Sequence, residues 1–113
     1  MAPYKKEQLI GAKLILLKAL KSFGPNGEHW IQGQGISDDG QNFCSVEATW
    51  MVGEHTAEKD IANFYLATAI NSNIIMWNDR PGRKFSEIKA GFCKAITLIT
   101  KELEKEEENE RKA

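Results

Sequence analysis

Hydrophobic residues recur at helical spacing near the start of the chain. Over residues 4–21 they alternate with lysines in a way that predicts one amphipathic helix. The recurring apolar residues are Leu9, Leu16, Leu17, Leu20 and Phe23. Gly24 and Pro25 are expected to end the helix, because glycine accepts the left-handed conformation after a last turn and proline cannot continue the hydrogen-bond ladder. We expect the apolar stripe to pack into the core.

Residues 29–44 follow a different pattern, rich in glycine and in side chains that favour turns. The pair Asp39-Gly40 favours a tight turn, and the residues on either side of it predict a short β-hairpin. Gly33 and Gly35 weaken the first strand and leave two interpretations open: a close approach of the backbone to a ligand, or flexibility without a function. One short hairpin or extended loop is therefore expected after the first helix.

The second half of the chain predicts further helices. Ser45 is placed to cap a brief helix that Gly53 closes, and Thr56 to cap another that ends near Asn71. The most regular pattern follows Lys84, with apolar residues at steps of three and four. These residues are Phe85, Ile88, Phe92, Ala95, Ile96, Ile99 and Leu103. The expected fold is mainly α, of the α+β kind, with three or four helices and the inserted hairpin or loop.

The composition fits one globular domain. The chain has 113 residues, of which 42% are hydrophobic and 27% charged, which are ordinary values for a globular protein. We assign residues 1–103 to the domain and expect residues 104–113, where charges replace the apolar stripe, to be a fraying helix end. Trp30, Trp50 and Trp77 are expected to help close the core.

Charge and cysteine usage narrow the class of protein. A net charge of −1 counts against a duplex nucleic-acid binder, although a single phosphate-bearing ligand stays possible. Cys44 and Cys93 lie far apart and form no C-x-x-C pair, so we interpret both as free thiols. Lys13 and Lys18 break the apolar run around residues 14–20, which is therefore not a signal peptide. No stretch reaches the ~20 apolar residues of a membrane span. A cytoplasmic location in a bacterial cell is expected.

Catalytic chemistry has little support in the sequence. A cysteine hydrolase would need Cys44 or Cys93 as the nucleophile with His29 or His55 as the base, and no local pattern joins them. A small hydrolase that uses Asp79 or Cys44 is the third and least favoured hypothesis for function. We name no catalytic residue.

Metal binding is also weakly supported. The two histidines stand alone, without clustered carboxylates around them. The pair Asp38-Asp39 lacks the alternating oxygen ligands and the closing glutamate of a calcium-binding loop, and we interpret it as a turn. No metal and no cofactor are expected.

Residues 77–84 read Trp-Asn-Asp-Arg-Pro-Gly-Arg-Lys and concentrate polar side chains between two apolar segments. Arg80 and Arg83 lie close to Trp77, and Lys84 stands just before a predicted helix. Guanidinium groups bind phosphate bidentately, a helix start adds N–H donors, and an indole can stack on a base. The combination suits a nucleotide.

A structural interpretation of the same stretch stays open. Asn78 and Asp79 can build an Asx turn ahead of Pro81 and Gly82, with the arginines solvated or paired to acidic neighbours. Trp77 would then belong to the core.

The order of these features resembles a family of small uncharacterised phage and bacterial proteins. The features are an N-terminal helix, Trp-Ile-Gln-Gly at residues 30–33, the turn at residues 39–40, a helix closed by Gly53, and residues 77–83. The hallmark of that family is Trp-Asn-Asp-x-x-Gly-Arg ahead of the last helix, and the resemblance covers about residues 12–99. It implies a setting in phages and their hosts and no established activity.

Two positions depart from the pattern of that family. It carries a cysteine in the middle helix, where this chain has Trp50. It also places a threonine after the arginine, where Lys84 stands here, while the glutamate of the capping box remains as Glu87. Loss of such a cap costs about 1 kcal/mol unless Ser86 or Asp79 replaces it.

Our first hypothesis is a non-enzymatic cytoplasmic binding protein of phage type that holds a small anionic ligand such as a nucleotide. One version is a counter-defence sponge that sequesters a nucleotide immune signal without cleaving it. The expected ligand-binding residues are Trp30, Gln32, Gln34, Trp77, Asn78, Arg80, Arg83 and Lys84. The alternative is a protein-interaction module, in which an apolar face of the first or last helix forms a symmetric dimer or docks on a host protein.

Overall fold

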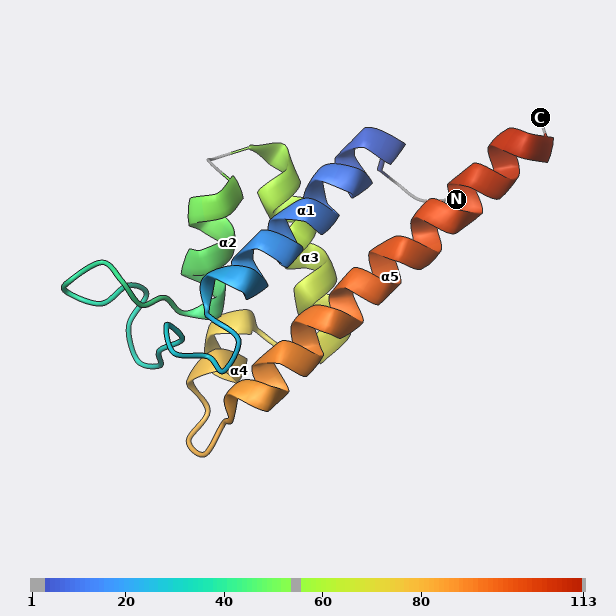
Figure 1. The fold of residues 1–113 in the computed structure, drawn as a ribbon. Helices are drawn as coiled ribbons and strands as arrows, with labels where there is room; N and C mark the ends of the chain where they lie inside the picture. The colour runs from blue at the N-terminus through green and yellow to red at the C-terminus, as the bar shows by residue number, and fades with distance from the viewer. Residues whose placement is uncertain (1–3, 54–55, 113) are drawn as a thin grey trace.

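Helices dominate the computed structural model, which describes residues 4–53 and 56–112 (Figure 1). Five helices lie in that part of the chain: α1 (Lys6–Ser22), α2 (Ser45–Gly53), α3 (Ala57–Ile70), α4 (Ile74–Asp79) and α5 (Phe85–Lys112). The prediction of a mainly α fold is confirmed, although three or four helices were expected. The additional helix is α4, which begins at residues interpreted only as an apolar lead into a turn.

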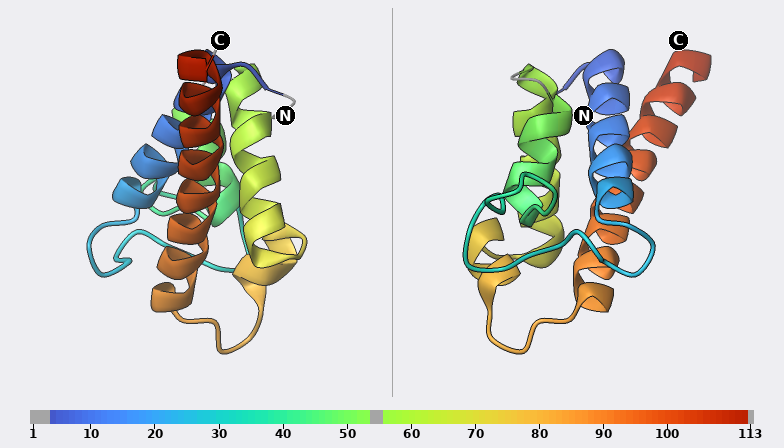
Figure 2. Two further views of the ribbon diagram at one scale, coloured as in Figure 1. Left: turned by 90° about the vertical axis from the view of Figure 1, so that its right-hand side faces the viewer. Right: turned by 60° about the vertical axis from the view of Figure 1, so that its left-hand side comes forward.

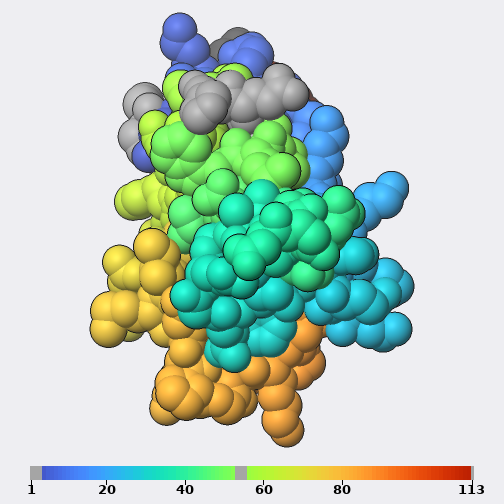
Figure 3. Space-filling model, turned by 90° about the vertical axis from the view of Figure 1, so that its left-hand side faces the viewer, coloured from blue at the N-terminus to red at the C-terminus, as the bar shows by residue number. Residues whose placement is uncertain are grey.

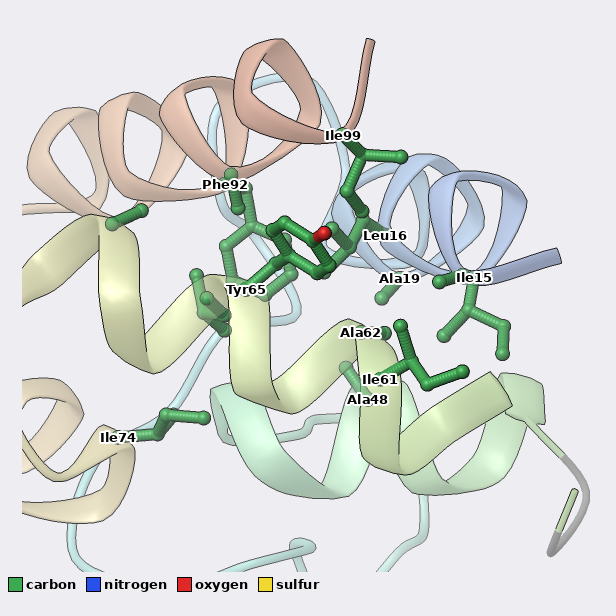
Figure 4. Close-up of a cluster of buried hydrophobic side chains, with 14 of the residues drawn as sticks. Ile15, Leu16, Ala19, Ala48, Ile61, Ala62, Tyr65, Ile74, Phe92 and Ile99 are labelled. Atoms are coloured by element: carbon green, nitrogen blue, oxygen red, sulfur yellow. The ribbon is translucent and has the colours of Figure 1, made fainter. Parts of the chain in front are cut away.

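The core lies between α1, α3 and α5, which pack against one another (Figure 2). Leu16 of α1, Tyr65 of α3 and Phe92 of α5 meet between the three helices (Figure 4). The Phe92 ring also meets Phe23 edge to face, with the ring centroids 5.7 Å apart. The helices α2 and α4 pack on α3, and α2 also packs on α1, so that they close one side of this core.

Within α1, the buried face shares only Leu9 and Leu16 with the predicted stripe. Leu20 is half-buried. The buried residues of α1 are Leu9, Ala12, Ile15, Leu16 and Ala19. Small alanines bring the helix close to its neighbours, and the buried stripe therefore follows Ala12 and Ala19. Leu17 lies on the other side of the helix and is 43% exposed, so its expected place in the core is wrong.

The three tryptophans have different environments. Trp77 is buried and Trp30 is half-buried against the core, as expected. Trp50 is 39% exposed on α2, which corrects the expectation that it closes the core. Its ring instead receives the ammonium group of Lys59, which lies 3.2 Å from the ring centroid in a cation–π contact.

The segment between α1 and α2 forms a long loop, and the expected hairpin is not found in the described part of the chain. Phe43 makes isolated bridges to two places at once, one parallel to Trp30 and one antiparallel to Ile36. Gly33, with φ of 83°, turns the chain between them, so neither pairing extends into a ladder. The turn at Asp39-Gly40 is present. Figure 3 shows this loop spread over the surface beside α4 and the connection to α5.

The helix ends agree with several predicted signals. Asn71 ends α3 in the left-handed conformation, as predicted. The side chain of Asn73 caps α4, a helix that was not predicted, by accepting a hydrogen bond from the Met76 amide at 3.1 Å. Residues 104–112 continue α5 as helix, with Lys112 and Glu108 paired at 3.1 Å. Among the described helices, none has both the length and the apolar character to cross a membrane.

Candidate functional site

Asn78, near the end of α4, is completely buried, and its side-chain amide is the centre of a hydrogen-bond network. Its Oδ1 atom accepts hydrogen bonds from Trp30 Nε1 at 2.8 Å, Ser45 Oγ at 2.7 Å and the Ser45 amide at 3.0 Å. Its Nδ2 atom donates to the Ile31 carbonyl at 3.0 Å and to Asp79 Oδ1 at 2.9 Å. Both ends of the amide are satisfied, as a buried polar group requires.

The same network extends along the loop. Gln32 Nε2 donates to two carbonyls, those of Asn78 at 2.9 Å and Arg80 at 2.8 Å. The Gly33 amide donates to Asp79 Oδ1 at 3.0 Å. We call this set the Asn78 network. It consists of Trp30, Ile31, Gln32, Gly33, Ser45, Asn78, Asp79 and the carbonyl of Arg80. It joins the long loop, the start of α2 and the end of α4.

Trp77 connects this network to the last helix. Its side chain is 8% exposed, and its ring lies against Gly91 of α5. A Cβ atom added at Gly91 would come within 2.6 Å of Trp77 Cζ2, which is closer than van der Waals packing allows. The glycine therefore provides the space that lets the Trp77 ring of α4 pack on α5.

Arg83 is held in place by three contacts. Its guanidinium carbon lies over the Trp77 ring, 5.6 Å from the ring centroid, in a cation–π contact. Its Nε atom donates to the Trp77 carbonyl at 2.9 Å, and its Nη1 atom lies 3.3 Å from Glu87 Oε2. Glu87 Oε1 also accepts a hydrogen bond from the Lys84 amide at 2.9 Å, which supplies the remaining half of a capping box. This hydrogen bond holds the pKa of the Glu87 carboxyl below its ordinary value, and the charge of Arg83 lowers the pKa further.

Two adjoining hollows lie beside this loop. The larger has a volume of about 500 Å³ and is lined by Ile70, Ser72, Met76, Trp77, Asp79, Arg80, Pro81 and Arg83. The smaller has a volume of about 260 Å³ and is lined by Arg80, Pro81, Gly82, Arg83 and Glu87. Both arginines border both hollows. The larger one combines cationic groups with an apolar wall, which is the usual character of a small-molecule site.

A family model matches residues 7–98, which is most of the chain. The chain belongs to DUF6197, a family of unknown function. The expectation of an uncharacterised family is confirmed. The match to DUF6197 includes the Asn78 network, Trp77 and both arginines, and it ends within α5. No curated protein and no solved structure matches the chain at a significant level. The DUF6197 assignment names no activity, so function has to be argued from the site.

The structure brings most of the predicted ligand-binding residues of this DUF6197 chain to one region, in two groups. Trp30, Gln32 and Asn78 direct their polar atoms into the Asn78 network. Trp77, Arg80 and Arg83 line the larger hollow. Lys84 is exposed at the start of α5, and Gln34 is exposed in the loop, outside the lining of both hollows.

Two residues of this region were missed as site residues. Ser45 was interpreted only as a helix cap, yet it is completely buried and donates two hydrogen bonds to Asn78. Met76 is 72% exposed and forms part of the apolar wall. Ser45 and Asn78 are 33 positions apart, and no local pattern predicts such a pair. Asp79 accepts hydrogen bonds from the network and does not replace the missing cap of α5.

The cysteines are both free, as interpreted from the sequence. Cys44 is buried, and its sulfur accepts a hydrogen bond from the Glu47 amide at 3.4 Å. Burial raises the pKa of the Cys44 thiol, which disfavours the thiolate that a nucleophile requires. Cys93 is exposed on α5, and His29 is exposed with Nδ1 3.2 Å from Asn42 Oδ1.

The remaining candidates for a catalytic base or a metal ligand are His55 and the carboxylates. His55 lies outside the described residues. The residues 4–53 and 56–112 contain no group of three or more histidine, cysteine, aspartate or glutamate side chains close enough to hold a metal ion. The carboxylate of Asp39 accepts hydrogen bonds from the Ser37 hydroxyl at 2.6 Å and the Gln41 amide at 3.0 Å, as a turn residue does.

Proposed function

We propose that this chain is a non-enzymatic binding protein for a small ligand that joins a phosphate group to an aromatic or apolar group, such as a nucleotide. The observation that carries the proposal is the position of Arg80 and Arg83, which border both hollows beside Trp77. A hollow of about 500 Å³ is in the range of pockets that hold small molecules. The ligand would place its phosphate between the arginines and its base against Met76 and Trp77.

The two arginines have different parts in this proposal. Arg83 is already fixed by the Trp77 carbonyl and Glu87, so it would offer its remaining N–H groups with little loss of side-chain freedom. Arg80 is exposed at the rim and would turn toward the phosphate when the ligand enters. Lys84 adds positive charge at the next turn. The carboxylate of Glu87 would repel an anionic ligand and so limit the binding affinity.

The Asn78 network has a supporting part. Trp30, Gln32 and Asn78 were expected to contact the ligand. Their polar atoms form hydrogen bonds within the protein instead, so in this proposal they support the site and do not contact the ligand. Gln32 holds the Arg80 carbonyl, and Asn78 holds α4 to the loop. These residues would position the arginines, and Gln34 has no part in the site.

Binding without turnover is part of the proposal. Asp79, the carboxylate in the wall of the larger hollow, accepts hydrogen bonds from Gly33 and Asn78. Cys44 is a buried thiol with a raised pKa. In the setting of a phage and its host, we propose that the protein sequesters a nucleotide signal from host defence. The support for that setting is the resemblance of the sequence to phage and bacterial proteins.

The proposal is tested by titration of the purified protein with AMP, ADP and inorganic phosphate. We expect the nucleotides to bind more tightly than phosphate and to shift the amide resonances of residues 70–83. Arg80→Ala should weaken nucleotide binding by roughly 10-fold to 100-fold, the worth of one charged hydrogen bond. Arg111→Ala, at the exposed end of α5, is the matched control and should leave binding unchanged. Failure of both nucleotides to bind, or equal affinities for wild type and Arg80→Ala, would overturn the proposal.

A second candidate function, a protein-interaction module, is favoured by a separate observation. Ile10, Leu14 and Leu17 are large apolar residues exposed on one side of α1. If the biological effect of the protein is lost on substitution of these residues while nucleotide binding is retained, the interaction module is the better description.

A further inference from the structure

The exposed side of α1 carries a stripe of residues that is acidic toward one end, apolar in the middle and basic toward the other end. Leu14 is at its centre and is 49% exposed. Glu7 lies toward the N-terminal end of the stripe, and Lys18 and Lys21 lie toward the C-terminal end. We define the α1 stripe as the exposed residues Glu7, Ile10, Leu14, Leu17, Lys18 and Lys21. At 3.6 residues per turn, all of them lie within about 60° of Leu14 around the helix axis.

Hollows border this stripe on both sides. One of about 230 Å³ lies between α1 and the end of α2, with Leu14 and Val52 in its lining. Another of about 410 Å³ lies between α1 and the start of α5, with Leu17 and Phe85 in its lining. A ridge between two grooves is the shape that packs against a second helix ridge. In Figure 1, α1 lies toward the viewer in front of α3.

We infer that the α1 stripe is the contact surface of a symmetric dimer in which two copies of α1 pack antiparallel. Position 14 lies midway between positions 7 and 21. A two-fold axis at Leu14 therefore places Glu7 opposite Lys21 of the partner subunit, about 10 Å from the axis at 1.5 Å per residue. Each dimer gains two such ion pairs.

The same axis also matches the apolar positions. Ile10 lies opposite Lys18 of the partner subunit, whose aliphatic stem can cover it. Leu17 lies opposite Gly11 of the partner subunit, where the partner subunit's Glu58 covers the glycine and offers the aliphatic stem of its side chain as the contact. Leu14 meets its own copy on the axis. The stripe is thus complementary to itself in charge and in the placement of its apolar side chains.

The order of charges along the α1 stripe favours a second copy of α1 as the partner, in the antiparallel direction. A parallel pairing would place Glu7 against Glu7 and Lys21 against Lys21 of the partner subunit, which is repulsive at both ends. The antiparallel pairing turns the same charges into attractive pairs. One helix pair buries less surface than the roughly 1,200–2,000 Å² of a stable complex, so we expect weak, concentration-dependent association. This inference goes beyond ligand binding and does not rest on it, because no residue of α4 belongs to the stripe.

Sedimentation velocity from low micromolar to near-millimolar concentration tests the dimer. We expect a monomer–dimer equilibrium in the wild type. Leu14→Glu places two like charges on the axis and should weaken dimerisation roughly 100-fold or more. Ile75→Glu, at an exposed aliphatic residue of α4, is the matched control and should leave dimerisation unchanged. A wild type that stays monomeric throughout, or a dimer that survives Leu14→Glu, overturns the inference.

Exchange of charge tests the antiparallel direction. Glu7→Lys and Lys21→Glu should each weaken the dimer roughly tenfold, because two exposed ion pairs become repulsive. The double variant restores both pairs with reversed sign and should dimerise like the wild type. Single variants without effect would show a parallel or unrelated contact and would overturn the inference. Circular dichroism of every variant checks that the exposed substitutions leave the helices intact.

Discussion

The apolar core and the Asn78 network are both buried, but they hold the protein together in different ways. In the core, Leu16, Phe92 and their neighbours are completely buried and interact through non-directional packing. In the network, Asn78 is equally buried, and four of the five hydrogen bonds of its side chain depend on the position of a distant segment. The core therefore specifies that the helices associate, and the network specifies where the long loop lies.

The substitution with the largest expected effect on stability removes the Asn78 side chain, and it tests whether the network is as important to stability as the core. Asn78→Ala leaves Trp30 Nε1, the Ser45 hydroxyl and the Ile31 carbonyl without their buried partner. We expect the free energy of unfolding to fall by about 3–4 kcal/mol, since each unsatisfied buried group costs about 1–3 kcal/mol and water entry recovers a part. Urea denaturation measures this loss.

Asn73→Ala is the matched control for that substitution. Asn73 is also an asparagine that makes a side-chain hydrogen bond near α4, but it is exposed and caps the helix start. Its loss should cost about 1 kcal/mol. Hydrogen exchange should show a second difference, because only Asn78→Ala should release the amides of Phe43 and Cys44. Equal costs for the two variants would contradict the central place of Asn78.

Periodicity predicted much of the core, because packing follows the helical repeat. The stripe from Ile88 to Ile99 was found as expected, since each turn of α5 faces the same neighbours. The prediction was wrong at Leu17 because hydrophobicity alone does not show which side of α1 faces inward. Alanines at positions 12 and 19 mark the buried side, and they carry too little hydrophobicity to stand out in the sequence.

The candidate site was predicted less well. The density of polar groups in residues 77–84 pointed to the region where the two hollows and the Asn78 network lie, and the structural interpretation placed Trp77 in the core as found. The partners of Asn78 could not be predicted, because Trp30 and Ser45 are 48 and 33 positions away and meet it only in the folded chain. The hairpin was expected from the turn at Asp39-Gly40, which is present without the ladder that usually accompanies it.

An intermediate effect is expected where the core and the network meet. Gly91→Ala would bring a Cβ atom within 2.6 Å of Trp77 Cζ2 and 3.0 Å of Ile70 Cγ2. Overpacking of this kind costs about 1–3 kcal/mol, and the better helix propensity of alanine returns about 1 kcal/mol. We expect a net loss of stability of up to about 2 kcal/mol by thermal or urea unfolding.

Trp77→Phe provides the control for the Gly91 substitution. Phenylalanine lacks the second ring of the indole and with it the Cζ2 atom, so the added methyl group no longer clashes there. In the Trp77→Phe background, Gly91→Ala should be neutral or stabilising. A penalty of the same size in both backgrounds would show that the indole is not what excludes a side chain at position 91.

The smallest effect is expected at Glu87, an exposed residue outside the Asn78 network, where the contribution to stability depends on pH. The pKa of Glu87 is lowered from the ordinary 4.5, mainly by the hydrogen bond from the Lys84 amide and also by the charge of Arg83. A carboxyl whose pKa is lower in the folded state stabilises the protein above its unfolded pKa and loses this contribution as the pH falls through the folded value. The stability advantage of wild type over Glu87→Gln should therefore be present at neutral pH and shrink below pH 4.5. A carboxyl titration by NMR with a midpoint at or above 4.5 would contradict it. Because the core has no such group, a stability difference that is present at neutral pH and disappears only in this acid range would belong to the contacts of Glu87 with the Lys84 amide and Arg83, and not to the packing of the helices.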